Sequence, residues 1–206
     1  MTEQVIEKKK PTSLSDWLRA HSKGILDPIA GFLNRIGLMP NTVTILGLAG
    51  NTIAAYFLGR GDMILGGIIV LLMGPVDALD GAMARLRGEP SDFGAFVDSV
   101  TDRYSELVIF LGLLVHYLLA GDWRASLLVY LAAAGSVLVS YVRARAQSVG
   151  VETKVGLLSR LERYLVIVPA LILNIPQVGL GIIAVFANIT AIQRIVYVRR
   201  QFRQGK

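Results

Sequence analysis

The 206-residue sequence contains no cysteine and only two histidines, and charged residues make up just 17% of it. The absence of cysteine excludes disulfides and thiolate metal sites, and it leaves nothing from which to infer a redox compartment. So little charge, beside 53% hydrophobic residues, excludes an ordinary soluble domain. The N-terminus also lacks the apolar core and cleavage site of a secretory signal peptide, which predicts a short cytosolic tail over residues 1–13.

Long uncharged apolar segments are what the sequence does contain. No charged residue occurs from Asn41 to Leu58 or from Tyr164 to Thr190, and the mean hydropathy is +0.56. A stretch of about 20 apolar residues is long enough to cross a bilayer as a helix. The sequence therefore predicts an all-α, multi-pass membrane protein.

Six transmembrane helices are expected, preceded by an amphipathic helix. The expected spans are residues 41–58, 63–87, 93–119, 123–147, 157–175 and 178–198. Asn41 at the start of the first span can cap its free N–H groups. Residues 14–38 alternate apolar and polar side chains at helical spacing, which predicts a juxtamembrane helix in the interface with Trp17 at headgroup level. The alternative is a solvent-facing helix packed on the membrane domain. The six-helix domain then covers residues 39–200, and residues 201–206 form a basic cytosolic tail.

The distribution of basic residues predicts the orientation. The turns at residues 59–62, 121–124 and 174–177 contain only Arg60 and Arg124, whereas the opposite ends of the spans collect the remaining basic clusters. Basic loops favour the cytoplasmic side, so both termini are expected there, in the cell membrane. Because these residues gather at segment ends, anionic lipid headgroups explain the net charge of +6 better than nucleic acid does.

Four aspartates lie where the second and third spans approach one turn. Asp77 and Asp80 come late in the second span, and Asp98 and Asp102 come early in the third. Spacings of three and four residues keep each pair on one helical face. At about 1.5 Å per residue, all four fall at a similar depth near the cytoplasmic end. The two pairs are therefore expected to meet, with the active site on the cytoplasmic side.

Converging carboxylates in a partly dehydrated site repel one another and need a compensating charge. Oxygen ligands without Cys or His favour Mg²⁺ or Mn²⁺, and two such ions would suit phosphoryl chemistry. Gly81, Ala84 and Gly94 keep bulky side chains away from the helix backbones, and Arg85 can hold a phosphate. The alternative makes the aspartates salt-bridge partners of Arg85, Arg87 and Arg103, as in a transporter or a packed polar core. A small cation transporter would use the aspartates as a conduction or coupling site.

The same residues carry a family resemblance. The fixed positions are Asp77, Asp80, Gly81, Ala84, Arg85, Gly94, Asp98 and Asp102. Their spacing resembles the signature of the CDP-alcohol phosphotransferase (CDP-alcohol phosphatidyltransferase) family at every position. The N-terminal amphipathic helix and the six-helix layout are similar to that family as well.

The resemblance implies a metal-dependent transfer that displaces CMP from a CDP-linked lipid by attack of an acceptor hydroxyl. It implies that Asp77, Asp80, Asp98 and Asp102 bind the metal ions and that Asp102 is also the general base. It assigns the CDP site to Asn41, Asp80, Gly81, Ala84, Arg85 and Gly94. It further implies membrane lipids as surroundings and a homodimer.

The acceptor is predicted from the arginines near the ends of the fourth and fifth spans, Arg143, Arg145, Arg160 and Arg163. Arginine is suited to bidentate capture of a phosphate on the acceptor. The run from Gly156 to Arg163 resembles the segment with which phosphatidylinositol-phosphate synthases and their archaeal ether-lipid counterparts bind inositol phosphate. That resemblance implies inositol 1-phosphate as the acceptor. The alternative acceptor, also a phosphate monoester, is the glycerol 3-phosphate used by phosphatidylglycerophosphate synthases.

Overall fold

The computed structural model describes the backbone of residues 14–88, 91–153 and 155–204, and side chains within these ranges from residue 24 onward. This part of the chain is all-helical and contains no strand. Its helices are α1 (Leu14–Arg35), α2 (Pro40–Gly59), α3 (Met63–Arg87), α4 (Asp92–Leu119), α5 (Trp123–Ser148), α6 (Arg160–Ile172) and α7 (Pro176–Arg203). The predicted tail at residues 1–13, the side chain of Trp17 and the last two residues lie outside the described residues.

The helices α2 to α5 begin and end within one residue of their predicted limits. The fifth and sixth predicted spans differ more from the structure. Helix α6 runs from Arg160 to Ile172 rather than over residues 157–175, and α7 runs from Pro176 to Arg203 rather than over residues 178–198. The backbone N–H groups of Leu157 and Leu158 both donate to the Thr190 hydroxyl of α7, at 3.1 Å each. These groups hold the chain against α7 in a non-helical conformation, and the helix begins only after Ser159.

Four helices are long and apolar enough to cross a membrane, namely α2, α3, α5 and α7. The other two predicted spans are weaker on this measure. The first half of α4 carries Asp98, Asp102, Arg103 and Glu106. At about 1.5 Å per residue, the 13-residue α6 is about 20 Å long, shorter than a hydrocarbon core of about 30 Å. The chain is thus a multi-pass membrane protein whose six-span count stays a prediction.

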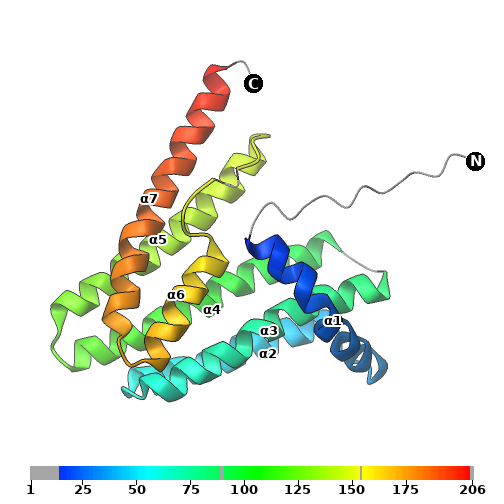
Figure 1. Cartoon of the computed structure of the whole chain (residues 1–206), viewed down its shortest axis with the longest axis horizontal. Helices are drawn as coiled ribbons and strands as arrows, with labels where there is room; N and C mark the ends of the chain where they lie inside the picture. The colour runs from blue at the N-terminus through cyan, green and yellow to red at the C-terminus, as the bar shows by residue number, and fades with distance from the viewer. Residues whose placement is uncertain (1–13, 89–90, 154, 205–206) are drawn as a thin grey trace, which may run out of the picture.

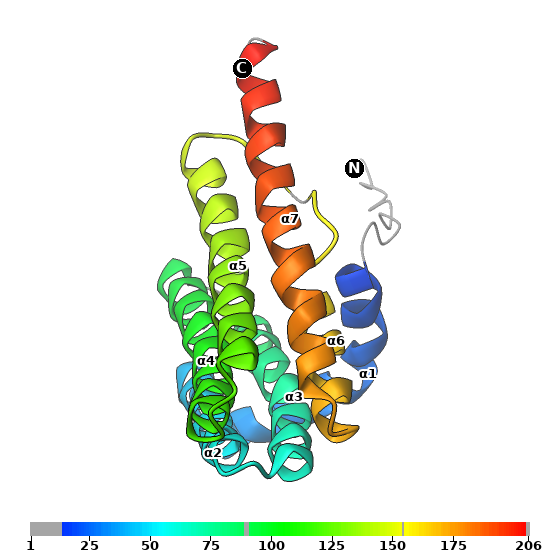
Figure 2. The same cartoon turned by 90° about the vertical axis from the view of Figure 1, so that its left-hand side faces the viewer.

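The helices pack as two neighbouring groups, α1 to α3 and the pair α5 and α7 (Figures 1 and 2). Helices α4 and α6 lie between the two groups and contact both. Helix α2 packs against both α3 and α4, and the long helices α5 and α7 run side by side. Helix α4 also contacts α5, while α6 packs between α3 and α7. At one end of the molecule, Gln177 donates to Asp122 at 3.1 Å, which ties the α4–α5 turn to the start of α7.

Helix α1 packs along α3 with one face only. Ala30 is fully buried there, and Leu26 and Leu33 pack against the same small cluster. Next to this packed face, α1 exposes large apolar side chains, among them Ile25 and Phe32, which are 70% and 62% exposed. The position of this helix in the membrane interface stays a prediction.

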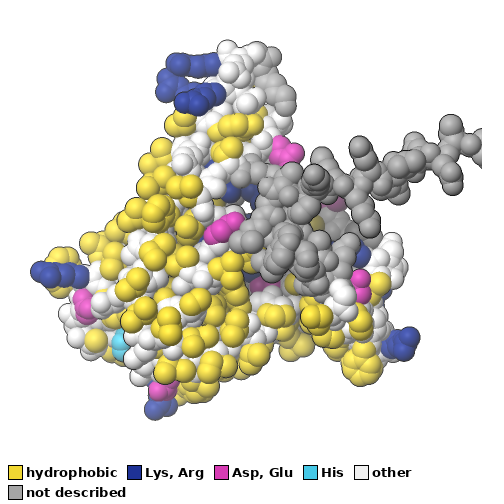
Figure 3. Space-filling view, in the orientation of Figure 1, with side chains coloured by type: hydrophobic (Ala, Val, Ile, Leu, Met, Phe, Trp, Pro, Cys, Tyr) yellow, Lys and Arg dark blue, Asp and Glu magenta, His cyan; other side chains and the backbone are white. Residues whose placement is uncertain are grey.

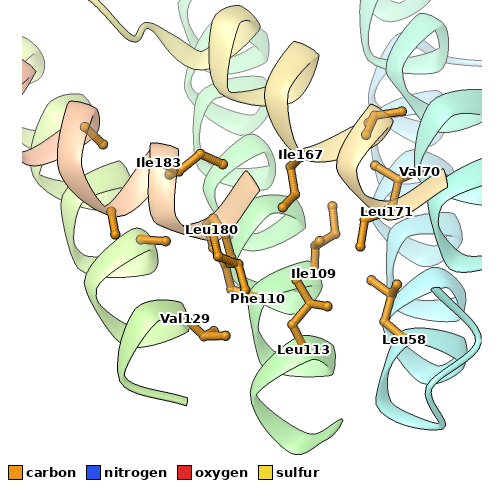
Figure 4. Packing of buried hydrophobic residues seen from close by; sticks show 14 of the residues in the cluster. Leu58, Val70, Ile109, Phe110, Leu113, Val129, Ile167, Leu171, Leu180 and Ile183 are labelled. Atoms are coloured by element: carbon orange, nitrogen blue, oxygen red, sulfur yellow. The ribbon is translucent and has the colours of Figure 1, made fainter. Parts of the chain in front are cut away.

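The main core lies where α2 to α7 meet (Figure 4). Phe110 and Leu113 of α4 face Val129 of α5 and Leu180 of α7, while Leu171 of α6 lies toward α2 and α3. Outside this core the surface stays apolar, as Figure 3 shows for one face, where Lys and Arg side chains stand at the margins and at the tip of α7. Exposed apolar surface of this extent is expected of a protein surrounded by lipid.

Small residues allow α2 and α4 to pack closely, as is usual for membrane helices. A Cβ added at Gly112 of α4 would overlap the backbone carbonyl of Ala55 in α2, whereas one added at Gly181 of α7 would meet no atom within 4 Å. These glycines form a matched pair, since both lie inside helices.

We expect Gly112→Ala to destabilise the protein, because overpacking costs about 1–3 kcal/mol. Gly181→Ala should leave stability unchanged or raise it by up to about 1 kcal/mol, through the better helix propensity of alanine. Thermal unfolding in detergent, followed by circular dichroism, measures both. Equal unfolding temperatures for the two variants would contradict the close packing of α2 on α4.

Candidate active site

The two aspartate pairs come together where the end of α3 meets the start of α4. Asp80 is the most buried of the four, with 5% of its surface exposed. It accepts a 2.5 Å hydrogen bond from the hydroxyl of Thr44 in α2, which is 4% exposed. The N–H of Gly81 also donates to its other oxygen, at 2.5 Å. Thr44 therefore fixes the Asp80 carboxylate against α2.

Asp77 lies one turn before Asp80 and faces the same side of α2. A Cβ added at Gly47 would stand 3.0 Å from the Asp77 carboxylate, so this position has room for glycine but little for a larger residue. Thr44 and Gly47 are three residues apart, as are Asp77 and Asp80, and the two antiparallel helices match position by position. One face of α2 thus receives both aspartates of α3.

The guanidinium of Arg160, the first residue of α6, joins the two helices that carry the aspartates. Its Nη2 lies 2.7 Å from Asp77 Oδ2 and 2.7 Å from Asp102 Oδ1. Asp98 lies close enough to both Asp80 and Asp102 for its charge to act on them. The four carboxylates therefore share one electrostatic environment, and a cationic side chain already lies between two of them.

The donor set suits a hard divalent cation, because it consists of carboxylates without Cys or His. Among the described residues, no three His, Cys, Asp or Glu side chains are gathered around a single point. Asp77 and Asp102 instead direct their oxygens at the Arg160 guanidinium. Carboxylate oxygens from α3 and α4 can therefore reach the same positive charge, which is the property that a metal site at this junction requires.

A groove of about 370 Å³ opens beside Asp80, between the starts of α2 and α4 and the end of α3. Its lining includes all six residues assigned to the CDP site, which are Asn41, Asp80, Gly81, Ala84, Arg85 and Gly94. Asp98 and Thr44 line it as well. Asn41 does not act as the helix cap, because α2 is preceded by Met39 and shows no side-chain cap. It lies in the groove instead, near Gly94.

A second cavity, of about 50 Å³, lies on the other side of Asp77. It is lined by Asp77, Ser105, Glu106, Arg160 and Arg163, with apolar residues of α4, α6 and α7. The two cavities lie at different levels along α3, the larger one at Asp80 and the smaller one about one helical turn earlier, at Asp77. The site thus has a larger cavity beside Asp80 and a smaller cavity beside Asp77.

The four arginines predicted for the acceptor do not form one cluster. Arg160 reaches the aspartates with 40% of its side chain exposed, whereas Arg163 is 1% exposed. Arg163 makes a bidentate ion pair with Glu106 of α4, at 2.7 and 2.9 Å. Arg143 and Arg145 are exposed at the end of α5 and line neither cavity, and Arg145 donates to Ser148 in its own helix.

Residues of α7 hold the segment that leads into α6. The buried Arg194 donates to the carbonyl of Val139 in α5 at 2.7 Å and to that of Val155 at 2.9 Å. Thr190 accepts from Leu157 and Leu158, and a Cβ at Gly156 would overlap its methyl group. Thr44, Gly47, Thr190 and Arg194 were not predicted from the sequence. The spacing of Ser159 and Glu162 is typical of a helix start, and Ser159 is the residue before α6, although its hydroxyl bonds to the Glu162 carboxylate and not to a backbone N–H.

Apolar helices around a groove with buried carboxylates define a membrane protein with charged groups inside its helical bundle, which marks a functional site. The model of the CDP-alcohol phosphatidyltransferase family matches residues 37–196, and the chain belongs to this family.

Several similar proteins within this family are named as inositol phosphate synthases. An archaetidylinositol phosphate synthase of Pyrococcus horikoshii is 35% identical over 189 residues, covering 91% of this chain and 98% of the relative. A phosphatidylinositol phosphate synthase of Streptomyces avermitilis is 38% identical over 205 residues, covering 91% and 83%. The phosphatidylinositol phosphate synthase of Mycobacterium tuberculosis, solved with CDP-DAG bound, is 32% identical with a TM-score of 0.79 and covers 84% of this chain and 93% of its own. Its complex with manganese and citrate gives a TM-score of 0.80, with 84% and 88% covered.

The bond from Thr44 to Asp80 yields a direct prediction for stability. Thr44→Val keeps the shape and removes the hydroxyl, so a buried carboxylate loses a donor, at a cost of about 1.5–3 kcal/mol. Thr44→Ser keeps the donor and should retain most of the stability. Thr52→Val is the matched control, because Thr52 is exposed on the same helix and bonds only to Leu48 of its own helix. If Thr44→Val unfolds like Thr52→Val in chemical denaturation, the hydroxyl does not hold Asp80.

Proposed function

We propose that the protein transfers a phosphatidyl-type group from a CDP-linked lipid to the hydroxyl of inositol 1-phosphate and releases CMP. The observation that carries this proposal is the junction at Arg160, where carboxylates of α3 and α4 meet beside the groove. The family, the relatives named as inositol phosphate synthases and the CDP-DAG complex of a similar structure support it.

The CDP moiety is proposed to bind in the groove beside Asp80. A volume of about 370 Å³ is adequate for a nucleotide. Gly81 and Gly94 leave the helix backbones accessible, and Asn41 and Asp80 offer polar groups to the base or ribose. Arg85 stands at the rim, where its guanidinium can bind the diphosphate in bidentate fashion. The lipid chains would then leave the groove toward the apolar surface of the bundle.

The divalent cations, Mg²⁺ or Mn²⁺, are proposed to bind to Asp77, Asp80, Asp98 and Asp102. The structure of the Mycobacterium tuberculosis relative with manganese supports metal use in this family. When bound, such ions neutralise the diphosphate and make the acceptor hydroxyl more acidic. Two ions would match four carboxylates in number. The Thr44 hydroxyl holds the Asp80 carboxylate in place for this role. In the described structure the guanidinium of Arg160 forms ion pairs with Asp77 and Asp102.

Asp102 is proposed to act as the general base. It lies on α4 beside Asp77 and the small cavity, with 12% of its side chain exposed. The acceptor oxygen forms a bond to the lipid-side phosphorus, the bond from that phosphorus to CMP breaks, and the proton passes to the Asp102 carboxylate. A base held within hydrogen-bond reach of the hydroxyl contributes about 10²–10⁴-fold to such a step.

The acceptor phosphate is proposed to bind to Arg160, with Arg143 and Arg145 approaching from the end of α5. Arg160 is the best placed of them, since it is part exposed and borders the aspartates. Arg163 is proposed to have a structural role instead, because its guanidinium already donates two hydrogen bonds to the Glu106 carboxylate. We assign it to holding α6 against α4, where breaking the buried pair would cost about 3–5 kcal/mol.

A six-span arrangement with the site and both termini on the cytoplasmic side is proposed, because the basic loops favour it. In this proposal α4 and the short helix α6 complete the bundle around the aspartates, and α1 lies along the interface. A homodimer is proposed from the family resemblance.

The acceptor is tested with purified protein, Mg²⁺ and CDP-diacylglycerol in the presence of mixed acceptors. We expect release of CMP and, by mass spectrometry of the lipid product, preference for inositol 1-phosphate over glycerol 3-phosphate. A dominant phosphatidylglycerophosphate product would reassign the acceptor. No CMP with any acceptor would refute the enzyme and favour the cation-transporter alternative.

Metal removal is expected to abolish CMP release. Carboxylates that face the diphosphate would repel it without a compensating cation. Dialysis against EDTA followed by addition of Mg²⁺ or Mn²⁺ measures the loss and its recovery. Full activity in the presence of the chelator would contradict the proposed role of the four aspartates.

Arg160→Ala is expected to raise the KM for the acceptor about 10- to 100-fold, the size of a lost charged hydrogen bond of about 1.5–3 kcal/mol. The KM for the CDP-lipid should change much less, because the groove lies further along α3, at Asp80, and Arg160 does not line it. Arg124→Ala serves as the matched control, since Arg124 is exposed at the start of α5 and lines neither cavity. Equal effects of Arg160→Ala on both substrates would remove Arg160 from the acceptor site.

A further inference from the structure

A proline interrupts α3 just before its aspartates. Pro75 has no N–H, so the carbonyl of Leu71, four residues earlier, lacks its helical donor. The hydroxyl of Tyr164 in α6 lies 2.9 Å from that carbonyl and 3.0 Å from the neighbouring carbonyl of Val70. A side chain of another helix therefore supplies the hydrogen bond that the proline removes.

Gly74, the residue before the proline, leaves the space that the Tyr164 ring needs. A Cβ added at Gly74 would overlap the Tyr164 hydroxyl and stand near its ring carbons, so only glycine lets the ring reach the α3 backbone. Gly74, Pro75 and Tyr164 thus form one contact: the first gives access, the second frees a carbonyl, and the third donates to it.

The same face of α6 contacts α3 on the other side of the proline. Arg160 lies one turn before Tyr164 and binds Asp77, two residues after Pro75, at 2.7 Å. Helix α6 therefore contacts α3 both before and after its weakest point. Proline positions are where helices bend, because the lost hydrogen bond allows the two halves to change direction.

We infer that Tyr164 is a positioning residue that fixes the direction of the last turns of α3 and, through them, the Asp77 carboxylate. This role rests on the proposed function, in which Asp77 binds metal near the acceptor. Asp80 is less dependent on Tyr164, because the Thr44 hydroxyl holds it separately at 2.5 Å. Loss of the tyrosine hydroxyl should therefore act on the metal and acceptor side more than on the CDP side.

Binding of Mn²⁺, measured from the free Mn²⁺ signal in electron paramagnetic resonance, tests the role without turnover. Tyr164→Phe is expected to weaken Mn²⁺ binding about three- to tenfold, as for one lost hydrogen bond. Gly74→Ala displaces the hydroxyl and should reproduce the effect. Tyr130→Phe is the control, since Tyr130 is 65% exposed on α5 and should bind Mn²⁺ as the wild type does.

A double-mutant cycle separates positioning from general support of the fold. In Pro75→Ala the residue at 75 regains an N–H for the Leu71 carbonyl, so adding Tyr164→Phe should weaken Mn²⁺ binding less than about twofold further. In the kinetic assay, Tyr164→Phe should lower kcat and raise the acceptor KM while the CDP-lipid KM stays within about twofold of the wild type.

The positioning role is overturned if Tyr164→Phe binds Mn²⁺ like the wild type, or if its effect is equally large with alanine at position 75. A wild-type protein that binds Mn²⁺ but releases no CMP refutes the proposed function alone. A wild-type protein that binds no Mn²⁺ refutes both.

Discussion

The ion pairs of Arg160 with Asp77 and Asp102 are the interactions on which the site depends. Carboxylates on α3 and α4 lie among apolar helices, where an uncompensated charge is strongly disfavoured. Arg160 reaches both at 2.7 Å, and Thr44 donates to Asp80. The close packing of α2, with Gly47 opposite Asp77, allows this arrangement. The local chemistry at the aspartates thus sets how near α2, α3, α4 and α6 must approach.

Helix α6 has a short length that suits its task. Its 13 residues begin at the level of the aspartates, and its first turn carries Arg160. Tyr164 follows on the neighbouring turn and Arg163 pairs with Glu106, so α3 and α4 are both contacted from one helix. A longer helix continuing back to Leu157 would lose the bonds to Thr190 that define this start. The shortness of α6 is therefore a requirement of the site and not a defect of the bundle.

Much of this arrangement could be predicted from the sequence, because it depends on local periodicity. The limits of α2 to α5 follow from apolar runs and turn residues, and the spacing of Asp77, Asp80, Gly81 and Ala84 already places them on neighbouring faces. The sequence could not show which faces of different helices meet. Thr44 opposite Asp80, Tyr164 opposite Leu71 and Glu106 opposite Arg163 are pairings between residues 36 to 93 positions apart. Arg163 looked free for a phosphate only because its partner lies on another helix.

The anchoring of residues 155–158 by α7 has a consequence for how new acceptor preferences could arise. Arg194 and Thr190 bind the backbone of this segment rather than its side chains, so its path is encoded about 35 residues downstream of its own sequence. The exposed side chains of Val155 and Leu157 can vary while that path is kept, whereas Leu158 is buried in the core. Exchange of the whole segment between related proteins, in contrast, would succeed only if the two α7 positions and Gly156 travelled with it. The loop and the face of α7 that binds it are therefore expected to change together in evolution.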